Sequence, residues 1–596
     1  MESLSHYQDI QNRFQAQAAK EQKIFSQLGN GKLLVFVALI AATFLLIRNS
    51  TTTNWLLSGL LFVLLIVLAV YQSAFKRRLH YSKAMVNISG QYLQRIEGNW
   101  REFADTGTEF AINDHPYADD LDVIGPASLW QLICIAKSWH GRRQLAQDLL
   151  EPAYTMTEIA DRQQAVAELH QKRLFACQLE YSTAQIGPAV ELPKIIASLA
   201  DGQAYLPNQA ARLFVRLMPL LTIALLVVAS LLRIQALYLP LFFLASFQLL
   251  VWLAAMPKTS PYLATVNLAP LIFGHYATAL NTVAQEKFTD KHLQAIQNDL
   301  QEAIGAIHEL DLIVNRISVK NFGIFYYLLN IMLFWDFDCA IKLSNWKARY
   351  GKRCEFWLLQ LGELESLLSL SVLGNTCNTA CLPEVDPTIR GVKARLLGHP
   401  LLSNKTRVCN DFEQQEQLLL VSGSNMSGKT TFLRTVGLNL LLARTGGYAC
   451  AESLACGSFQ LISSMRVRDD LSEGYSSFYA ELRRIARIVA AAKTEGDLFF
   501  LIDEIFRGTN SEDRLAGATA VIQELSHQQA LGLVTTHDLS LCDLAKSLNN
   551  LCNYSFAEHY QGEQMLFDYR LRRGKSTSTN AQFLMRQVGI KPQKIK

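Results

Sequence analysis

One short stretch of this chain, LLLVSGSNMSGKTTFLRT at 418–435, restricts its fold more than any other feature. Four apolar residues lead into the pattern G-x-x-x-x-G-K-T, which runs from Gly423 to Thr430. Glycines in such a loop let successive backbone N–H groups converge on a phosphate-sized hollow. Because a strand is expected at 418–421 and a helix at 431–442, the pattern predicts a nucleotide-binding α/β domain.

Each part of this loop has an expected role. We expect Lys429 to reach the β- and γ-phosphates of ATP, and the hydroxyl of Thr430 to complete the shell of a Mg²⁺ ion. The positive end of the following helix adds to the attraction for phosphate. The residues expected to contact the nucleotide are Gly423, Ser424, Asn425, Met426, Ser427, Gly428, Lys429, Thr430 and Thr431.

Two adjacent carboxylates stand at the end of a second apolar run, 498–502. We expect Asp503 to hold Mg²⁺ through water and Glu504 to polarise the water that attacks the nucleotide. A third strand is expected at 531–538, where His537 is placed to sense the γ-phosphate. A solvated strand end is the alternative for the carboxylates, and a structural role is the alternative for the histidine.

Four segments of the C-terminal part resemble, in order and in spacing, the four ATPase motifs of the MutS family. They read GSNMSGKTTFLRTVG, RVRDDLSEGYSSFYAELRRIARIV, LIDEIFRGTNSEDRLAGATAVI and LVTTHDLSLCDL. Three upstream segments, at 120–169, 363–373 and 396–402, are similar to landmarks of that family's helical core. The resemblance covers most of 100–590 apart from one inserted apolar segment. It implies an ATPase that uses ATP and works as a homodimer.

The resemblance also implies a nucleotide site that two subunits share. In the MutS family a serine of one subunit closes the site of the other, and Ser476 matches that serine, with Ser477 beside it. A hydroxyl and a helix N-terminus aimed at a γ-phosphate would make dimer closure depend on ATP. An ordinary helix N-cap is the alternative for this pair of serines.

Four long apolar runs distinguish this chain from a soluble ATPase. They occur as two pairs, each joined by a short polar turn, at 33–47 with 55–70 and at 217–232 with 236–255. Helices that are apolar on all sides and nearly long enough to cross a bilayer predict two transmembrane hairpins. Pairs of buried core helices are the alternative. Because almost no ionisable residue lies in the middle of these runs, we expect anchors in the lipid bilayer rather than a transport path.

Basic residues gather on one side of the four runs. Each polar turn holds one arginine, Arg48 or Arg233, whereas the outer flanks hold Arg13, Lys20, Lys23, Lys32, Lys76, Arg77, Arg78, Arg212, Arg216 and Lys258. This distribution predicts that both termini and the ATPase lie on the cytoplasmic side of the cell (inner) membrane.

One more apolar stretch, FGIFYYLLNIMLFWDF at 322–337, invites a fifth span. It is short, it contains Asn330, and it ends near Asp336 and Asp338. A fifth span would also place the phosphate-binding loop outside the cell, away from ATP. We therefore expect a core helix here.

The expected organisation alternates soluble and membrane segments in a chain of 596 residues, half of them hydrophobic. Its eleven cysteines form no C-x-x-C pair, which favours reduced thiols over a zinc site. The expected segments are a polar helix at 1–30, a transmembrane hairpin at 31–75, the first part of a helical core at 76–210, a second hairpin at 211–257, the rest of the helical core at 258–390 and an α/β ATPase at 391–596.

These features predict a membrane-anchored, dimeric ATPase of the MutS type that cycles between ATP-closed and ADP-open states. Apolar helices occupy the region before Asp120, where that family carries its mismatch-reading domain, so mismatch recognition in its usual form is not expected. The expected target is DNA or a protein complex, and the net charge of +4 does not decide between them. The basic tail at 570–596 suits DNA phosphates or anionic lipid. The alternatives are an ABC-type transporter, against which the absence of an L-S-G-G-Q loop argues, and an ATP-gated protein scaffold that binds no nucleic acid.

Overall fold

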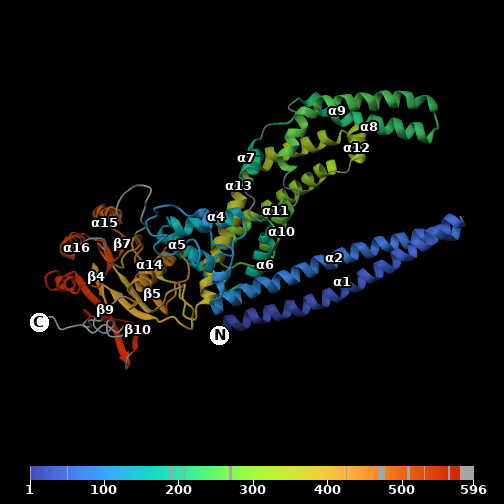
Figure 1. Cartoon of the computed structure of the whole chain (residues 1–596). Helices are drawn as coiled ribbons and strands as arrows, with labels where there is room; N and C mark the ends of the chain where they lie inside the picture. The colour runs from blue at the N-terminus through green and yellow to red at the C-terminus, as the bar shows by residue number, and fades with distance from the viewer. Residues whose placement is uncertain are drawn as a thin grey trace. The chain divides into compact units, whose positions relative to one another are not determined.

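The computed structural model of the chain divides into two compact units, which we describe separately (Figure 1). The first comprises Met1–Cys134, Ala146–Cys177 and Leu368–Lys596, and the second comprises Ile135–Leu145 and Gln178–Leu367. The structure describes residues 2–49, 51–187, 192–202, 204–206, 208–267, 272–321, 323–415, 417–424, 426–466, 477–494, 496–506, 511–528, 530–561 and 564–576.

The first unit holds the described strands and seven of the described α-helices. Its helices are α1 (Glu2–Arg48), α2 (Thr52–Glu97), α3 (Leu129–Ile133), α5 (Met156–Gln171), α14 (Lys429–Thr445), α15 (Ser477–Thr494) and α16 (Ser511–Ser526). The helices of the second unit are α7 (Leu192–Ala200), α8 (Gln209–Leu231), α9 (Tyr238–Asn267), α10 (Ile272–Gln285), α11 (Lys291–Ile317) and α12 (Ile324–Leu333). Three helices contain residues of both units: α4 (Trp139–Leu150), α6 (Arg173–Ala184) and α13 (Trp335–Thr376).

Helices α1 and α2 form one long antiparallel pair (Figure 1). Polar halves meet through contacts such as the stacked rings of Tyr7 and Tyr92, 4.5 Å apart, and the 2.7 Å hydrogen bond that Ser82 donates to Glu21. The apolar halves leave most of their side chains exposed. Both helices run without a break through 30–31 and 75–76, where segment boundaries were expected, although Gly31 lies at the first of these points.

The α/β domain contains two sheets. A six-stranded sheet has the order β10-β9-β4-β8-β7-β6, and a four-stranded sheet has the order β1-β5-β2-β3. The strands are β1 (Glu384–Val385), β2 (Val392–Leu397), β3 (Asn410–Gln414), β4 (Leu418–Ser422), β5 (Ser453–Cys456), β6 (Gln460–Ser464), β7 (Leu498–Asp503), β8 (Leu531–Thr536), β9 (Leu551–Gln561) and β10 (Gln564–Arg573). Parallel pairing of β4, β8 and β7 brings their carboxyl ends to one edge.

The strands expected from the apolar runs are present as β4, β7 and β8, and the expected helix is α14. Every residue of these three strands is buried, which explains why the sequence shows continuous rather than alternating hydrophobicity. Helices α15 and α16 contribute Ile488 and Ile522 to the core that covers Phe500 and Val534. The central sheet is therefore a rigid base for the loops at its edge.

Within the first unit, a segment upstream of α3 is tied to the α/β domain by buried polar contacts. The Asp120 carboxylate accepts hydrogen bonds from Ser463 Oγ at 2.7 Å and from the backbone N–H of Arg466 at 2.9 Å. Asp122 pairs with Arg434 of α14 at 2.8 Å. These contacts join the first part of the helical core to the helix that follows the phosphate-binding loop.

Five described helices are long and apolar enough to cross a membrane by length and composition alone. Four of them, α1, α2, α8 and α9, contain the runs from which two hairpins were predicted, and their apolar windows are 0 to 22% buried. The fifth is α13, whose window is 78% buried within the protein. Burial thus separates α13, a core helix, from the other four.

The expected core helix at 322–337 is wrong in its burial and in its extent. The structure has a short helix, α12, which ends where Phe334 adopts φ 49° and α13 then begins. Ile324 is 88% exposed, and Phe325, Tyr327 and Leu328 are each more than half exposed. Sequence reasoning failed here because apolar side chains alone do not distinguish the interior of a protein from an exposed apolar surface.

Candidate functional site

The phosphate-binding loop follows β4 and leads into α14. Gly423 has φ +154° and Gly428 has φ +103°, conformations that side chains rarely tolerate. A Cβ on Gly423 would also lie 2.8 Å from Ser427 Oγ, so the loop can close only with glycine there. Met426 adopts φ 72° and is exposed at the loop's tip. Asn425, which was expected to contact the nucleotide, lies outside the described residues.

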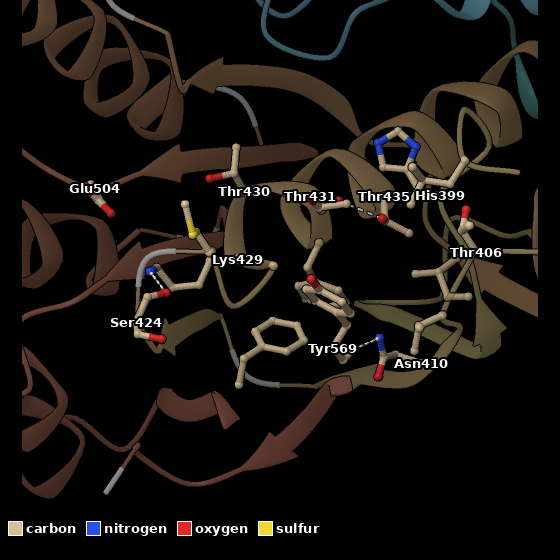
Figure 2. A pocket seen from close by; sticks show the side chains of 17 residues that line it. His399, Thr406, Asn410, Ser424, Lys429, Thr430, Thr431, Thr435, Glu504 and Tyr569 are labelled. Carbon is tan, nitrogen blue, oxygen red and sulfur yellow. Dashed lines mark hydrogen bonds between the residues drawn. The ribbon is translucent and has the colours of Figure 1, made fainter. Parts of the chain in front are cut away.

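Lys429 points its ammonium group back over this loop (Figure 2). Its Nζ donates hydrogen bonds to the carbonyl oxygens of Gly423 at 2.8 Å and Ser424 at 3.0 Å. Ser424 Oγ in turn donates to Glu558 Oε2 of β9 at 3.0 Å. The loop therefore holds a positively charged ammonium group, which can pair with the negative charge of a phosphate.

Asp503 and Thr430 form a second cluster at the same sheet edge. Asp503 Oδ2 accepts a 2.7 Å hydrogen bond from Thr430 Oγ1, and Asp503 Oδ1 accepts one of 2.5 Å from Thr535 Oγ1. The sheet register places Asp503 directly beside Thr535. Hydroxyl and carboxylate oxygens are the ligands that Mg²⁺ prefers, so these donors fit the expected ion.

Glu504 and His537 meet at this edge although they end different strands. Glu504 Oε1 lies 3.2 Å from His537 Nδ1, and the backbone N–H of Glu504 donates to Thr535 O at 3.2 Å. Glu504 adopts φ 60°, a conformation that is uncommon for a non-glycine residue and often found at functional sites. Sequence reasoning placed both residues near the γ-phosphate but did not predict that they contact each other.

A cavity of about 610 Å³ extends from the loop away from Glu504. Lys429, Thr430, Thr431 and Glu504 line one end of it, and Figure 2 shows Tyr569 between Lys429 and Asn410. The remaining wall includes residues that were not expected at the site, among them His399, Thr406, Val408, Phe432 and Phe556. This size suits a nucleotide whose base extends beyond the loop.

Tyr569 is the most informative residue that sequence reasoning missed. It lies at a bulge in the pairing of β9 with β10 and has φ 53°. Asn410 holds the bulge from both sides: its Nδ2 donates to Tyr569 O at 3.0 Å, and its Oδ1 accepts from the backbone N–H of Leu571 at 2.8 Å. A Cβ on Gly428 would lie 3.1 Å from Tyr569 Cδ1, so the ring lies directly against the loop.

His399 is neutral where it lines the cavity. Burial lowers its pKa to about 3, and the nearby positive charges of Arg434, Arg407 and Arg101 act in the same direction. Its Nδ1 accepts a hydrogen bond from the backbone N–H of Leu401 at 3.2 Å. The ring therefore contributes an uncharged surface to the far end of the cavity.

The structure thus brings together all but two of the residues expected at the site. Ser424, Met426, Gly428, Lys429, Thr430, Thr431 and Glu504 line the cavity, Gly423 and Ser427 form the loop behind it, and Asp503 and His537 lie at the sheet edge. Asn425 and Ser476 lie outside the described residues. Ser477 begins α15.

The same region matches a known family model. Residues 419–594 match the model of MutS domain V. The match includes all of β4 except Leu418, together with the loop, Asp503, Glu504 and His537.

Relatives with a shared name are similar to this chain, and one of them matches most of its length. Three are named "DNA mismatch repair protein MutS": from Chlorobium chlorochromatii, 26% identical over 81% of this chain; from Thermus aquaticus, 36% identical over 30%; and from Roseiflexus sp. (strain RS-1), 32% identical over 34%. The matched segments span 60%, 22% and 20% of these relatives. The chain therefore spans less than two thirds of the length of each of them.

Proposed function

We propose that this MutS-family chain is a dimeric ATPase that is anchored in a membrane and hydrolyses ATP to ADP and phosphate on the cytoplasmic face. The observation that carries the proposal is the hydrogen-bonded cluster of Thr430, Asp503 and Thr535, which lies beside Lys429 and Glu504 at the edge of one cavity. These residues supply a lysine for the phosphates, oxygens suited to Mg²⁺ and a carboxylate for the attacking water, which supports the proposal.

Lys429 and the backbone of the loop bind the phosphates, and Tyr569 offers its ring to the base. Thr430 and Asp503 would hold Mg²⁺, which when bound neutralises charge on the β- and γ-phosphates. Asp503 is kept in place by two hydroxyl donors, so its carboxylate is already oriented. The backbone N–H groups of the loop and the N-terminus of α14 add to the positive electrostatic potential at the phosphates.

Glu504 is the residue that orients the attacking water. Its carboxylate reaches the cavity, and the contact with His537 fixes the direction of that carboxylate. His537 is 44% exposed, so it can also approach a γ-phosphate at the cavity mouth. Ser476 of a second subunit is proposed to contact the same γ-phosphate, which would couple ATP binding to dimer closure.

Two hairpins anchor the chain in this proposal. The helix pairs α1–α2 and α8–α9 combine sufficient length with apolar side chains that are exposed, which a bilayer would cover. Basic residues flank their open ends, and this favours a cytoplasmic ATPase. Their central segments hold almost no charge, which favours anchors over a transport path and argues against the ABC-type transporter.

The target is proposed to be DNA, as the name of the relatives suggests, with a protein complex as the second candidate. The full chain should be reconstituted in lipid nanodiscs, and phosphate release should be measured with Mg²⁺ and with a chelator. Duplex, branched and single-stranded DNA should then be titrated by filter binding at fixed salt, with ADP and with ATP. We expect Mg²⁺-dependent hydrolysis and DNA affinity that differs between the two nucleotides.

The outcomes separate the candidate functions. Absence of hydrolysis would contradict the ATPase itself. Hydrolysis without DNA binding in either nucleotide state would favour the protein scaffold. Solute uptake into sealed vesicles that depends on ATP would favour the transporter.

A further inference from the structure

Helix α12 presents an apolar face that the described residues of the second unit leave exposed. Ile324 is 88% exposed, and Phe325, Tyr327 and Leu328 are between 52 and 57% exposed. We call these four side chains the α12 face. A soluble protein rarely exposes a cluster of this kind unless it contacts a partner or a membrane.

The polar groups of the same segment point away from this face. Asn330 is fully buried: its Nδ2 donates to Tyr326 O at 3.1 Å, and its Oδ1 accepts the backbone N–H of Asp336 at 3.0 Å. The Asp336 carboxylate is also buried and accepts a 2.5 Å hydrogen bond from the Tyr326 hydroxyl. A hydrocarbon environment demands that polar groups such as those of Asn330 and Asp336 be satisfied internally, and the exposed face consists of Ile324, Phe325, Leu328 and the ring of Tyr327.

Helix α12 is fixed to the second hairpin. Trp252 of α9 donates its Nε1–H to Asp336 Oδ2 at 2.9 Å, and its ring lies 5.8 Å from the rings of both Tyr326 and Tyr327. At the end of α12, Phe334 packs 6.3 Å from Phe214 of α8. Figure 1 shows α12 running beside α8 and α9. The α12 face therefore continues the exposed apolar surface of the hairpin.

Basic residues lie near both ends of α12: Phe334 at its end packs against Phe214, which stands between Arg212 and Arg216 of α8. Lys320, just before α12, donates to Ser260 of α9 at 3.1 Å, and Ser260 is two residues from Lys258. Trp252 lies about 9 Å along α9 from Lys258, at a rise of 1.5 Å per residue. With ten residues, α12 is about 15 Å long, roughly half of the hydrocarbon core of a bilayer.

We propose that α12 is a third membrane element, a short helix that enters the cytoplasmic leaflet beside α8 and α9 without crossing it, with acyl chains as the occupant of the α12 face. The proposal rests on the proposed anchoring of the second hairpin. Its aromatic residues at the basic rim match the belt of tryptophan and tyrosine at membrane interfaces. A protein partner is less suited to this face, because protein interfaces surround an apolar centre with a polar rim.

The test uses the full chain in nanodiscs that contain a phospholipid with a photoactivatable diazirine in its acyl chain. Lipid adducts are mapped by peptide mass spectrometry. We expect adducts on the peptide that holds Ile324–Leu328, as on the peptide that holds Phe247, an exposed residue of α9. The exposed Ala295 of α11 serves as the control that should carry none.

A second measurement shows whether the α12 face is shielded from water, whatever covers it. The variants Leu328→Cys, Phe247→Cys and Ala295→Cys are exposed to a membrane-impermeant maleimide, and labelling is read at each peptide so that the native cysteines do not interfere. We expect Leu328→Cys to be protected like Phe247→Cys, while Ala295→Cys is labelled.

The results distinguish two failures. Adducts at Phe247 without adducts at α12 would overturn this inference and leave the anchoring intact. Protection of Leu328→Cys without lipid adducts would also overturn it, because a second copy or a protein would then cover the face. Absence of adducts at both sites would contradict the anchoring itself.

Discussion

Thr430 and Asp503 lie 73 residues apart in the chain, and a 2.7 Å hydrogen bond joins the Thr430 hydroxyl to Asp503 Oδ2. The bond ties the first turn of α14 to the last residue of β7. Because Asp503 also accepts a bond from Thr535 on β8, α14 is linked to the carboxyl ends of two neighbouring parallel strands. The oxygens proposed to hold Mg²⁺ are thus oriented by the fold, and the predictions below follow from this geometry and its surroundings.

Replacement of Tyr569 should weaken ATP binding although every residue of the phosphate-binding loop is kept. Stacking of an aromatic ring on a base contributes about 1 to 3 kcal/mol, or roughly 5- to 150-fold in Kd. Tyr569→Ala should therefore raise the Kd for ATP by a factor in this range, whereas Tyr569→Phe should keep the affinity close to that of the wild type. Equilibrium titration with a fluorescent ATP analogue measures both. Equal affinity of the alanine variant and the wild type would place the base elsewhere.

Acidification should destabilise the protein through His399. Burial holds its folded-state pKa at about 3, below the ordinary value of 6.5. Between these values the unfolded chain binds a proton that the folded chain does not, so the free energy of unfolding falls as pH drops from 6.5 toward 3, and this group has no effect above 6.5. Denaturant unfolding at several pH values measures the slope.

The matched variant for this prediction is His399→Asn. Its amide oxygen can accept the hydrogen bond from the Leu401 N–H, but the side chain does not titrate. The slope of stability against pH should be smaller in the variant. It should not vanish, because burial also lowers the pKa of His140 to about 4. An unchanged slope would show that His399 is not neutral in the folded protein.

We expect packing to require glycine at position 351, although glycine is unfavourable in the interior of a helix. Gly351 lies within α13, where Ala ordinarily stabilises a helix by about 1 kcal/mol relative to Gly. A Cβ at Gly351 would lie only 2.1 Å from Leu199 O of α7, so Gly351→Ala should force the helices apart and cost about 1 to 3 kcal/mol. Gly305 of α11 has open space around it, and Gly305→Ala should stabilise instead. Thermal unfolding that shows the same sign for both variants would refute the packing argument.

Reporter fusions should place the two hairpin turns opposite to the ATPase. A reporter at residue 52 and another at residue 234 should be active on the outer side, and one placed between 100 and 130 should be active in the cytoplasm. This follows from the basic residues at the open ends of both hairpins. A cytoplasmic signal at either turn would contradict the two-hairpin arrangement.

Much of the site was predictable because its signals are local. The strand before the loop, the loop glycines and the Asp503–Glu504 pair each lie in a short stretch whose residue types dictate the backbone. The wall formed by His399, Asn410 and Tyr569 was not predictable, because it is assembled from strands that are distant in sequence. No pattern in the sequence predicts that Asn410 forms hydrogen bonds with the bulge at Tyr569.

The proposed membrane elements show the same limit from another side. Long uniform apolar runs predicted the helices α1, α2, α8 and α9, because runs of that length favour helices that are apolar on all sides. The short run of α12 was interpreted as core, because apolar side chains favour protein interior and lipid alike. Only the positions of Asn330 and Asp336, turned inward to Tyr326 and Trp252, distinguish the two environments.

The hydrolysis of ATP by Glu504→Gln tests the central claim most directly. Glutamine preserves the size of the side chain but cannot accept a proton from water, and general base catalysis contributes typically about 10²- to 10⁴-fold in rate. The variant in nanodiscs should bind ATP with wild-type affinity and release phosphate slower by a factor in that range, whereas Lys429→Ala should lose affinity for ATP. Phosphate release by Glu504→Gln at the wild-type rate would contradict the assignment of Glu504, and with it the proposed ATPase site.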